Sequence, residues 1–137
     1  MTAAPYRLDP EPPSVEEYLR LRADGGLSPF SPEAAAKALP RSLIAVTIRQ
    51  DGMAVGMGRA VGDGGCFVQI VDIVVAADHR GHGLGVRIME HLLARLRQIL
   101  PVTAHVSMLA DPPADRLYAR FGFAPTAPRS IGMALRL

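Results

Sequence analysis

The most distinctive segment of the sequence is a glycine-rich stretch, Ala76 to Gly85, whose last three glycines stand at alternate positions. The stretch lies between a strand-like run and a helical pattern, so these glycines fall where a helix begins. Unpaired N–H groups and the positive end of the helix dipole attract anions there, and the missing side chains at Gly83 and Gly85 let a phosphate approach the main chain. Arg80 adds a positive charge. The spacing favours a phosphate-binding loop, and the alternative is a tight strand-to-helix turn.

Two common phosphate motifs do not fit this loop. The dinucleotide-binding fingerprint needs a glycine where Val86 stands and an acidic residue about 20 positions later. The P-loop needs a Gly-Lys-Ser/Thr triplet, which the stretch lacks. Both motifs are therefore excluded.

Two further side chains are candidates for proton transfer. Asp72 is the only charged residue in the strand-like run Cys66–Val75, where a carboxylate can act as a base or can be a hydrogen-bonded structural group. Tyr118 lies on the apolar face of a short predicted helix, and that position alone is more typical of a core tyrosine. The four histidines show no metal-ligand spacing and Cys66 has no marked partner, so we predict neither a metal site nor a cysteine nucleophile.

Periodicity indicates the elements that must position these residues. Helical spacing and capping signals predict helices from the Ser14 cap to about Gly25 and over residues 31–39, 84–100 and 111–121. Alternating apolar residues predict strands over residues 6–8, 43–48, 53–61, 66–75, 102–109 and 131–137, with Asp51-Gly52 as a hairpin turn. The glycine-rich stretch therefore belongs to a strand-loop-helix-strand unit.

Two motifs in this order carry a resemblance to a known family. Residues 80–85, Arg-Gly-His-Gly-Leu-Gly, resemble the Gln/Arg-x-x-Gly-x-Gly/Ala motif of the GNAT superfamily of N-acetyltransferases, which bind the pyrophosphate of acyl-CoA there. Residues 117–123 are similar to the Tyr-x-x-x-Gly-Phe segment of the same family. The resemblance covers about residues 42–123. It implies a mixed α+β fold, with a twisted mixed central sheet flanked by about four helices.

The resemblance also implies roles for individual residues. The main chain of Ile73, Val74 and Val75 would pair with the pantetheine arm of acetyl-CoA. The loop amides would bind the pyrophosphate, and they belong to Arg80, Gly81, His82, Gly83, Leu84 and Gly85. Tyr118 would stand near the sulfur, where a phenol can supply a proton to the leaving thiolate, and Asp72 falls where the family often has an acid. Asp111 replaces an asparagine that often contacts the pantetheine region, so we expect this contact to differ.

Composition and charge narrow the class of protein further. An apolar share of 49% with a charged share of 20% is typical of a globular protein, and 137 residues fit one domain, 1–137. A net charge of +2 without any run of basic residues indicates no nucleic-acid partner, and no apolar run is long enough for a membrane span. One cysteine and an N-terminal stretch, Met1 to Pro13, without signal-peptide layout predict a cytoplasmic location.

Taken together, these observations predict an acetyl-CoA-dependent N-acetyltransferase domain that needs no metal. We expect it to acetylate a primary amine of a small molecule by direct attack in a ternary complex, with acceptor contacts from residues 25–31 and 126–132. The alternatives are a protein lysine or N-terminal acetyltransferase and a non-catalytic acyl-CoA-binding module. The resemblance also makes a homodimer plausible, with the C-terminal strand as its contact.

Overall fold

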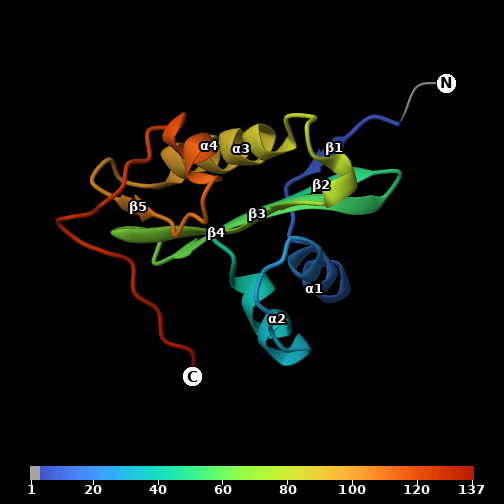
Figure 1. Cartoon of the computed structure of the whole chain (residues 1–137), viewed down its shortest axis with the longest axis horizontal. Helices are drawn as coiled ribbons and strands as arrows, with labels where there is room; N and C mark the ends of the chain where they lie inside the picture. Colours follow the sequence, from blue (N-terminus) through green and yellow to red (C-terminus); the bar gives the residue numbers. More distant parts are fainter. Residues whose placement is uncertain (1–3) are drawn as a thin grey trace.

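The computed structural model describes residues 4–137, so the first three residues of the expected domain 1–137 lie outside the described part. The described residues form five β-strands and four α-helices (Figure 1). The strands are β1 (Arg7–Asp9), β2 (Ile44–Gln50), β3 (Met53–Gly62), β4 (Phe67–Val75) and β5 (His105–Ser107). The helices are α1 (Val15–Asp24), α2 (Pro32–Ala38), α3 (Leu84–Ile99) and α4 (Asp115–Ala119). No helix in this part of the chain is both long and apolar enough to cross a membrane.

The five strands form one mixed sheet in sequence order. Strands β1 to β4 are antiparallel to their neighbours, whereas β5 runs parallel to β4. The mixed α+β class and the twisted central sheet are thus confirmed. The pairing of β4 with β5 stops at Gln69 and Ser107, so the second half of β4 has no strand on that side. This divergence leaves main-chain groups of β4 unpaired beside the glycine-rich loop.

A bulge divides β4 into two halves. Met57 pairs with Val74 and Arg59 with Val71, so Gly58 of β3 faces the two residues Asp72 and Ile73. Asp72 has a φ of +61°, in the left-handed region that is unfavourable for residues other than glycine. A side chain on Gly58 would clash with Ile88 of α3, whose Cγ2 lies 2.5 Å from the place of a Cβ. The glycine therefore lets α3 pack closely over the bulge.

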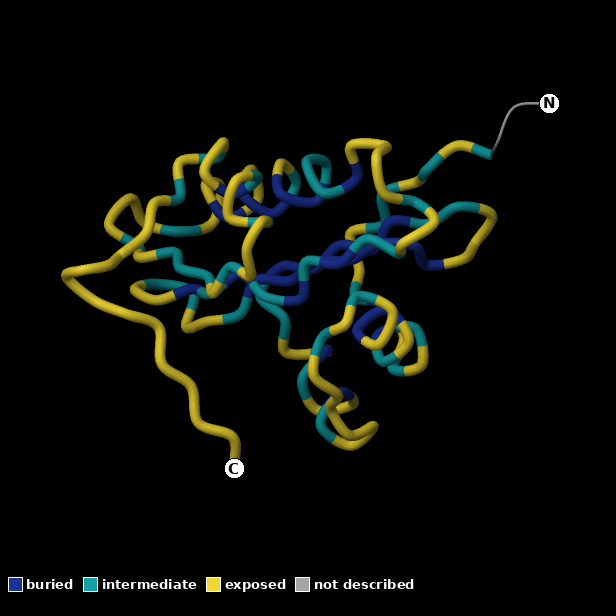
Figure 2. The backbone as a smooth tube through the Cα atoms, viewed as in Figure 1, coloured by how far each residue is buried: buried dark blue, intermediate teal, exposed yellow. Residues whose placement is uncertain are grey.

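Helices cover both faces of the sheet, and each face has its own core. Helices α3 and α4 lie on one side and α1 and α2 on the other (Figure 1). The apolar face of α3 is buried against β2, β3 and β4, as predicted, through Leu84, Ile88, Met89, Leu92, Leu93 and Leu96. Tyr18 and Leu21 of α1 pack with Met57 and Val74 on the opposite face. Figure 2 shows the buried positions concentrated on the central strands and the inner side of α3.

Two expectations about the C-terminal half are wrong. Helix α4 begins at Asp115 and not at the Asp111 cap, because Pro112 and Pro113 each disfavour a helical conformation in the residue that precedes them. Residues 131–137 are extended but form no strand, since neither β5 nor any other described strand pairs with them. Residues with an alternating pattern form a strand only where the edge of another strand is available to pair with them.

An ion pair between Glu17 and Arg49 holds the first helix to the sheet. Because this pair needs an ionised Glu17, we expect the protein to lose stability in acid. Glu17 completes a capping box with Ser14 and pairs with Arg49 of β2, at 2.7 Å between Oε2 and Nη1. The hydrogen bond from Arg49 is the main cause that lowers the pKa of Glu17 from 4.5 to about 2. The stabilisation is therefore present above pH 4.5 and is lost as the pH falls toward 2.

We expect Glu17→Gln to lower the free energy of unfolding by about 0.5–1 kcal/mol at pH 7, because glutamine keeps the capping box but removes the charge. The difference from wild type should shrink to nothing between pH 4.5 and about 2. Urea unfolding at several pH values measures this. An equal difference at pH 7 and pH 2 would show that packing, and not the ion pair, is responsible.

Candidate active site

The glycine-rich loop leaves β4 through a 3₁₀ turn, Ala77–His79, and enters α3 at Gly83, which is the N-cap residue. Gly81 and Gly83 have φ values of +84° and +75°, so both adopt the left-handed conformation that glycine tolerates without strain. A Cβ on either residue would meet no atom within 4 Å. Glycine is therefore required at both positions by the backbone conformation, and the space beside each of them is open.

The main-chain donors of this loop are free to bind a ligand. The Arg80 N–H donates to Ala77 O, and the next bonded N–H is that of Arg87, which donates to Gly83 O at 3.1 Å. Within the described chain, no N–H from Gly81 to Val86 donates to a protein acceptor. Free N–H groups at the positive end of a 16-residue helix form an anion site.

Polar side chains fix the ends of the loop. Arg80 Nε donates to Val75 O at 3.2 Å, so its guanidinium lies against the end of β4. His79 Nδ1 lies 3.0 Å from the Tyr6 hydroxyl, and the ring of His82 lies 5.7 Å from that of Tyr6. Tyr6 therefore contacts both histidines, which flank the loop.

The expected pantetheine segment lies on the unpaired edge of β4. Val74 and Val75 pair with β3 on one side, whereas the pairing with β5 on the other side has already ended at Gln69. No strand pairs with residues 71–75 on that side. Val75 O accepts from Arg80 Nε, and the other main-chain groups there are costly to leave unpaired unless water or a ligand satisfies them. The diverging strands thus place an unpaired edge directly before the anion-binding loop.

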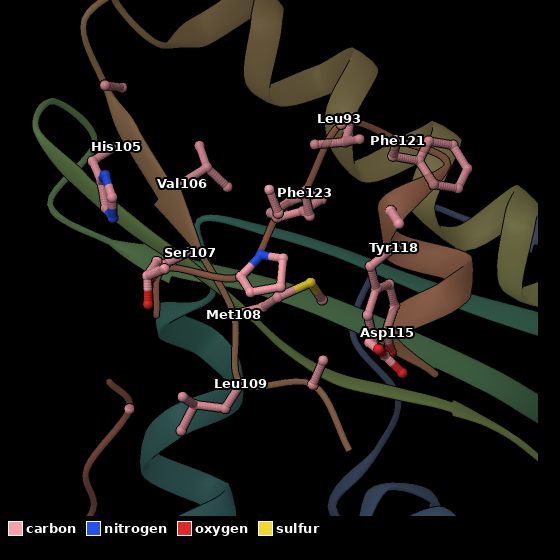
Figure 3. Close-up of a pocket in the computed structure, with 18 of the residues that line it drawn as sticks. Leu93, His105, Val106, Ser107, Met108, Leu109, Asp115, Tyr118, Phe121 and Phe123 are labelled. Carbon is pink, nitrogen blue, oxygen red and sulfur yellow. The ribbon is translucent and has the colours of Figure 1, made fainter. Parts of the chain in front are cut away.

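Tyr118 lies on α4, next to β5 and the C-terminal half of α3. Its neighbour Leu117 packs against the first turn of α3, with Cδ2 3.2 Å from the place of a Cβ on Gly85. The tyrosine is 8% exposed and lines an apolar groove of about 1070 Å³ between the end of α3, β5 and α4 (Figure 3). The Tyr118 hydroxyl has no hydrogen-bond partner in the protein. Because every buried polar side-chain atom in residues 4–137 does have one, this hydroxyl is not buried and reaches the groove surface.

The environment of Tyr118 keeps its phenol protonated. Burial raises the pKa of Tyr118 above 10, and the nearby negative charge of Asp111 raises it further. At any pH below this raised pKa the phenol is neutral and can donate a proton to a developing thiolate. Asp111, which replaces the expected asparagine, therefore acts on the tyrosine through its charge.

Asp72 lies at the centre of a buried charged cluster. Its Oδ1 accepts from Arg22 Nη1, and its Oδ2 accepts from Arg59 Nε at 2.8 Å and from the Tyr18 hydroxyl at 2.9 Å. Burial with charged and hydrogen-bonded partners on both oxygens is typical of a structural carboxylate. The cluster ties α1 to the bulge of β4 and to β3, so its contacts favour the structural interpretation over a general base.

We expect Asp72→Asn to lower the free energy of unfolding by about 3 kcal/mol, since two buried guanidinium groups would lose their counter-charge. Asp51→Asn is the matched control, because Asp51 also has a left-handed backbone, with a φ of +52°, but is exposed in a hairpin turn. Denaturant unfolding of both variants measures the difference. A variant at position 72 as stable as the control would contradict the account of the cluster.

The structure brings most of the predicted site residues together. Residues 73–75 end β4 and lead into loop 80–85, and Tyr118 lies on α4, whose Leu117 packs against Gly85 of the first turn of α3. Asp72 points to the opposite face of the sheet, where it meets α1. Sequence reasoning missed Arg22 and Arg59 as its partners. The position of Arg22 four residues after Tyr18, on the buried side of α1, was the available signal.

Comparisons with known proteins agree with this geometry. The acetyltransferase (GNAT) family matches residues 8–123. A crystal structure of a probable acetyltransferase from meticillin-resistant Staphylococcus aureus is 41% identical, with a TM-score of 0.93 over 97% of this chain and 100% of that chain. A glucosamine-6-phosphate N-acetyltransferase from Arabidopsis thaliana, 14% identical with a TM-score of 0.73 over 96% of this chain and 98% of that chain, shares the fold.

A relative known from its sequence covers a shorter segment. The uncharacterized N-acetyltransferase ycf52 of Porphyra purpurea is 36% identical over 69 residues, which are 50% of this chain and 38% of that protein. The match thus spans well under half the length of this curated relative. The family match, by contrast, covers most of the chain. The protein therefore belongs to the acetyltransferase (GNAT) family, as the resemblance implied.

Proposed function

We propose that the protein transfers the acetyl group of acetyl-CoA to a primary amine of a small molecule, by direct attack in a ternary complex. One observation carries the proposal: three features lie around the start of α3. The edge of β4 that β5 leaves free leads into the loop, the amides of loop 80–85 are free, and α4 with Tyr118 packs through Leu117 against Gly85. We assign them to the pantetheine, the pyrophosphate and the thioester of acetyl-CoA, respectively.

Each feature has a separate task in this proposal. The loop amides bind the pyrophosphate, and the free edge of β4 orients the pantetheine arm through main-chain hydrogen bonds. The thioester supplies the acetyl group. Tyr118 donates a proton to the departing sulfur as the C–S bond breaks and the C–N bond forms. The amine loses one proton through water, and the tyrosine regains one, so a proton passes overall from amine to thiol.

Asp72 has a positioning role in the proposal. Both of its oxygens accept hydrogen bonds from protein donors. The Asp72 carboxylate is therefore a poor base for removing a proton from the amine. The same bonds hold the bulge, and the bulge sets the direction of residues 73–75. Its loss should therefore act first on stability and on cofactor affinity.

The C-terminal tail favours a small acceptor over a protein chain. Arg136 Nη2 donates to Ser28 Oγ at 2.7 Å, and its guanidinium carbon lies 5.6 Å from the centre of the Phe30 ring. These contacts join the tail to the loop between α1 and α2, which is an expected acceptor segment. Because the tail contacts this loop, a polypeptide acceptor has less access to it than a small amine has.

A cytoplasmic location belongs to the same proposal. Acetyl-CoA is used there as a donor, and the single cysteine, Cys66, is a free and exposed thiol. Exposed free thiols are typical of proteins kept in reducing compartments.

Release of free thiol from acetyl-CoA in the presence of an acceptor panel tests the proposal. The panel contains small primary amines, lysine-containing peptides and peptides with free N-termini. We expect at least one small amine to raise thiol release well above hydrolysis without acceptor. Turnover with peptides alone would identify a protein acetyltransferase, and binding of acetyl-CoA without any turnover would identify a binding module.

A further inference from the structure

Two arginine side chains from distant parts of the chain meet at the loop between α1 and α2. Arg22 of α1 donates through Nη2 to Ser28 O at 2.6 Å and to Ser28 Oγ at 3.4 Å. Arg136 of the C-terminal tail donates to the same Ser28 Oγ at 2.7 Å. Their guanidinium carbons lie 4.5 and 5.6 Å from the centre of the Phe30 ring. Two cations therefore share one hydroxyl and one aromatic ring.

A third arginine, Arg59 of β3, extends this group, which we call the arginine cluster (Arg22, Arg59 and Arg136). Arg59 and Arg22 share the carboxylate of Asp72. The Arg59 side chain is only 8% exposed, and its Nη2 has no acceptor within the described chain. Because every buried polar side-chain atom there does have a partner, this Nη2 is not sealed in the protein and offers unused donors to solvent or a ligand.

The arginine cluster carries more positive charge than its surroundings balance. Within the described chain, the ion pairs of the cluster all go to Asp72. The loop of residues 25–31 and the tail of residues 124–137 contain no acidic side chain. Three guanidinium groups therefore face one carboxylate. Cations that are removed from water without a counter-charge are costly, so this arrangement favours a bound anion.

The arginine cluster lies next to the part of β4 that the proposed function assigns to the pantetheine. The loop between α1 and α2 begins at Gly25, where a Cβ would lie 3.0 Å from Val74 Cγ1. Asp72, which pairs with the cluster, directly precedes residues 73–75 at the bulge. Figure 1 shows α1 and α2 on the face of the sheet opposite to α3. An acceptor that contacts this loop therefore approaches the donor from the α1 side, where the cluster lies.

We propose that the acceptor is a small primary amine that also carries an oxyanion, a carboxylate or a phosphate, and that the arginine cluster binds this oxyanion. The inference rests on the proposed function and names the class of its acceptor. Guanidinium groups bind both oxyanions through paired N–H donors. Arg136 is exposed and makes the direct contact, while Arg22 and Arg59 add positive potential. That potential disfavours cationic acceptors such as polyamines and lysine-rich peptides.

Matched pairs of amines test this assignment: each amino acid against its C-terminal amide, and phosphoethanolamine against ethanolamine. We expect the anionic member of at least one pair to exceed its neutral partner in kcat/KM by about tenfold or more. The two kinds of pair distinguish a carboxylate from a phosphate. A carboxylate raises the pKa of the neighbouring amine, so ionisation of the amine alone would favour the amide.

Arg136→Gln should lower the kcat/KM of the anionic acceptor about 10- to 100-fold, because a hydrogen bond between charged groups is lost. The loss should appear in the KM of the acceptor, and the KM of acetyl-CoA and the rate with the neutral partner should stay the same. Arg95→Gln is the control, because Arg95 is an exposed arginine of α3 that contacts Gln98. It should change none of these quantities.

The outcomes separate this inference from the proposed function. Neutral or cationic amines that react as well as anionic ones would contradict the inference and leave the proposed function intact, as would an Arg136→Gln variant that keeps the anionic preference. If no amine reacts, the proposed function fails, and NMR of the arginine Nε groups still tests the cluster. With CoA bound, inorganic phosphate should shift the signals of Arg22 and Arg136 but not of Arg95. Absence of these shifts would overturn the inference.

Discussion

Replacing Tyr118 by phenylalanine should lower kcat about a thousandfold while the affinity for acetyl-CoA stays at the wild-type value. The hydroxyl reaches the groove without a protein partner, and burial together with Asp111 raises the pKa of the phenol above 10. Loss of a positioned general acid costs roughly 100- to 10,000-fold in rate. The ring itself stays, so the apolar packing of α4 on α3 should survive. Kinetics of thiol release and calorimetric binding measure the two quantities.

Tyr6→Phe is the matched control for this prediction. It removes a hydroxyl that bonds to His79 beside the anion site, and it should change kcat little. The wild-type kcat should also show no fall from ionisation of Tyr118 until the pH exceeds 10, because the raised pKa keeps the phenol protonated. Wild-type turnover in Tyr118→Phe would show that this residue is a core tyrosine only.

The second large effect is expected at Gly83, where aspartate should weaken acetyl-CoA binding about a thousandfold. Like charges brought together in a binding site cost several kcal/mol, which corresponds to a factor of this size. The left-handed φ of +75° adds backbone strain of about 1–3 kcal/mol. Isothermal titration with acetyl-CoA measures the affinity, and thermal unfolding measures the strain separately.

Two controls separate charge from strain. Gly52→Asp introduces the same side chain at a φ of +76° in the β2–β3 turn, away from the loop, and should bind acetyl-CoA normally. Gly83→Asn has the strain without the charge, so it should bind acetyl-CoA far more tightly than Gly83→Asp. Equal affinities of the two Gly83 variants would contradict a phosphate at this position.

The sequence was sufficient where local signals agree with the fold. The Ser14 and Ser31 caps, the Asp51-Gly52 turn and the apolar face of α3 each depend on residues near in sequence. The glycine spacing also predicted the free amides of the loop, because left-handed glycines before a helix leave few alternatives.

The periodicity of the sequence could not predict the bulge in β4. Val68, Ile70 and Val74 are all buried at alternate positions, which predicts one common face. In the structure Val68 and Ile70 face α3, whereas Val74 faces α1, because the extra residue at Asp72 reverses the alternation. The partners of Asp72 could not be predicted for the same reason.

The tail shows a second kind of limit. Its alternating residues are typical of a strand, yet a strand requires an edge to pair with, and the described chain supplies none.

The central claim is that the loop and the edge of β4 hold the cofactor through their main chain. A titration of ¹⁵N-labelled protein with CoA, followed by two-dimensional NMR, tests it without knowledge of the acceptor. We predict the largest amide shifts from Gly81 to Gly85 and from Ile73 to Val75, with little change at the Gly52 turn. Binding that shifts other amides while these stay unchanged would contradict the account.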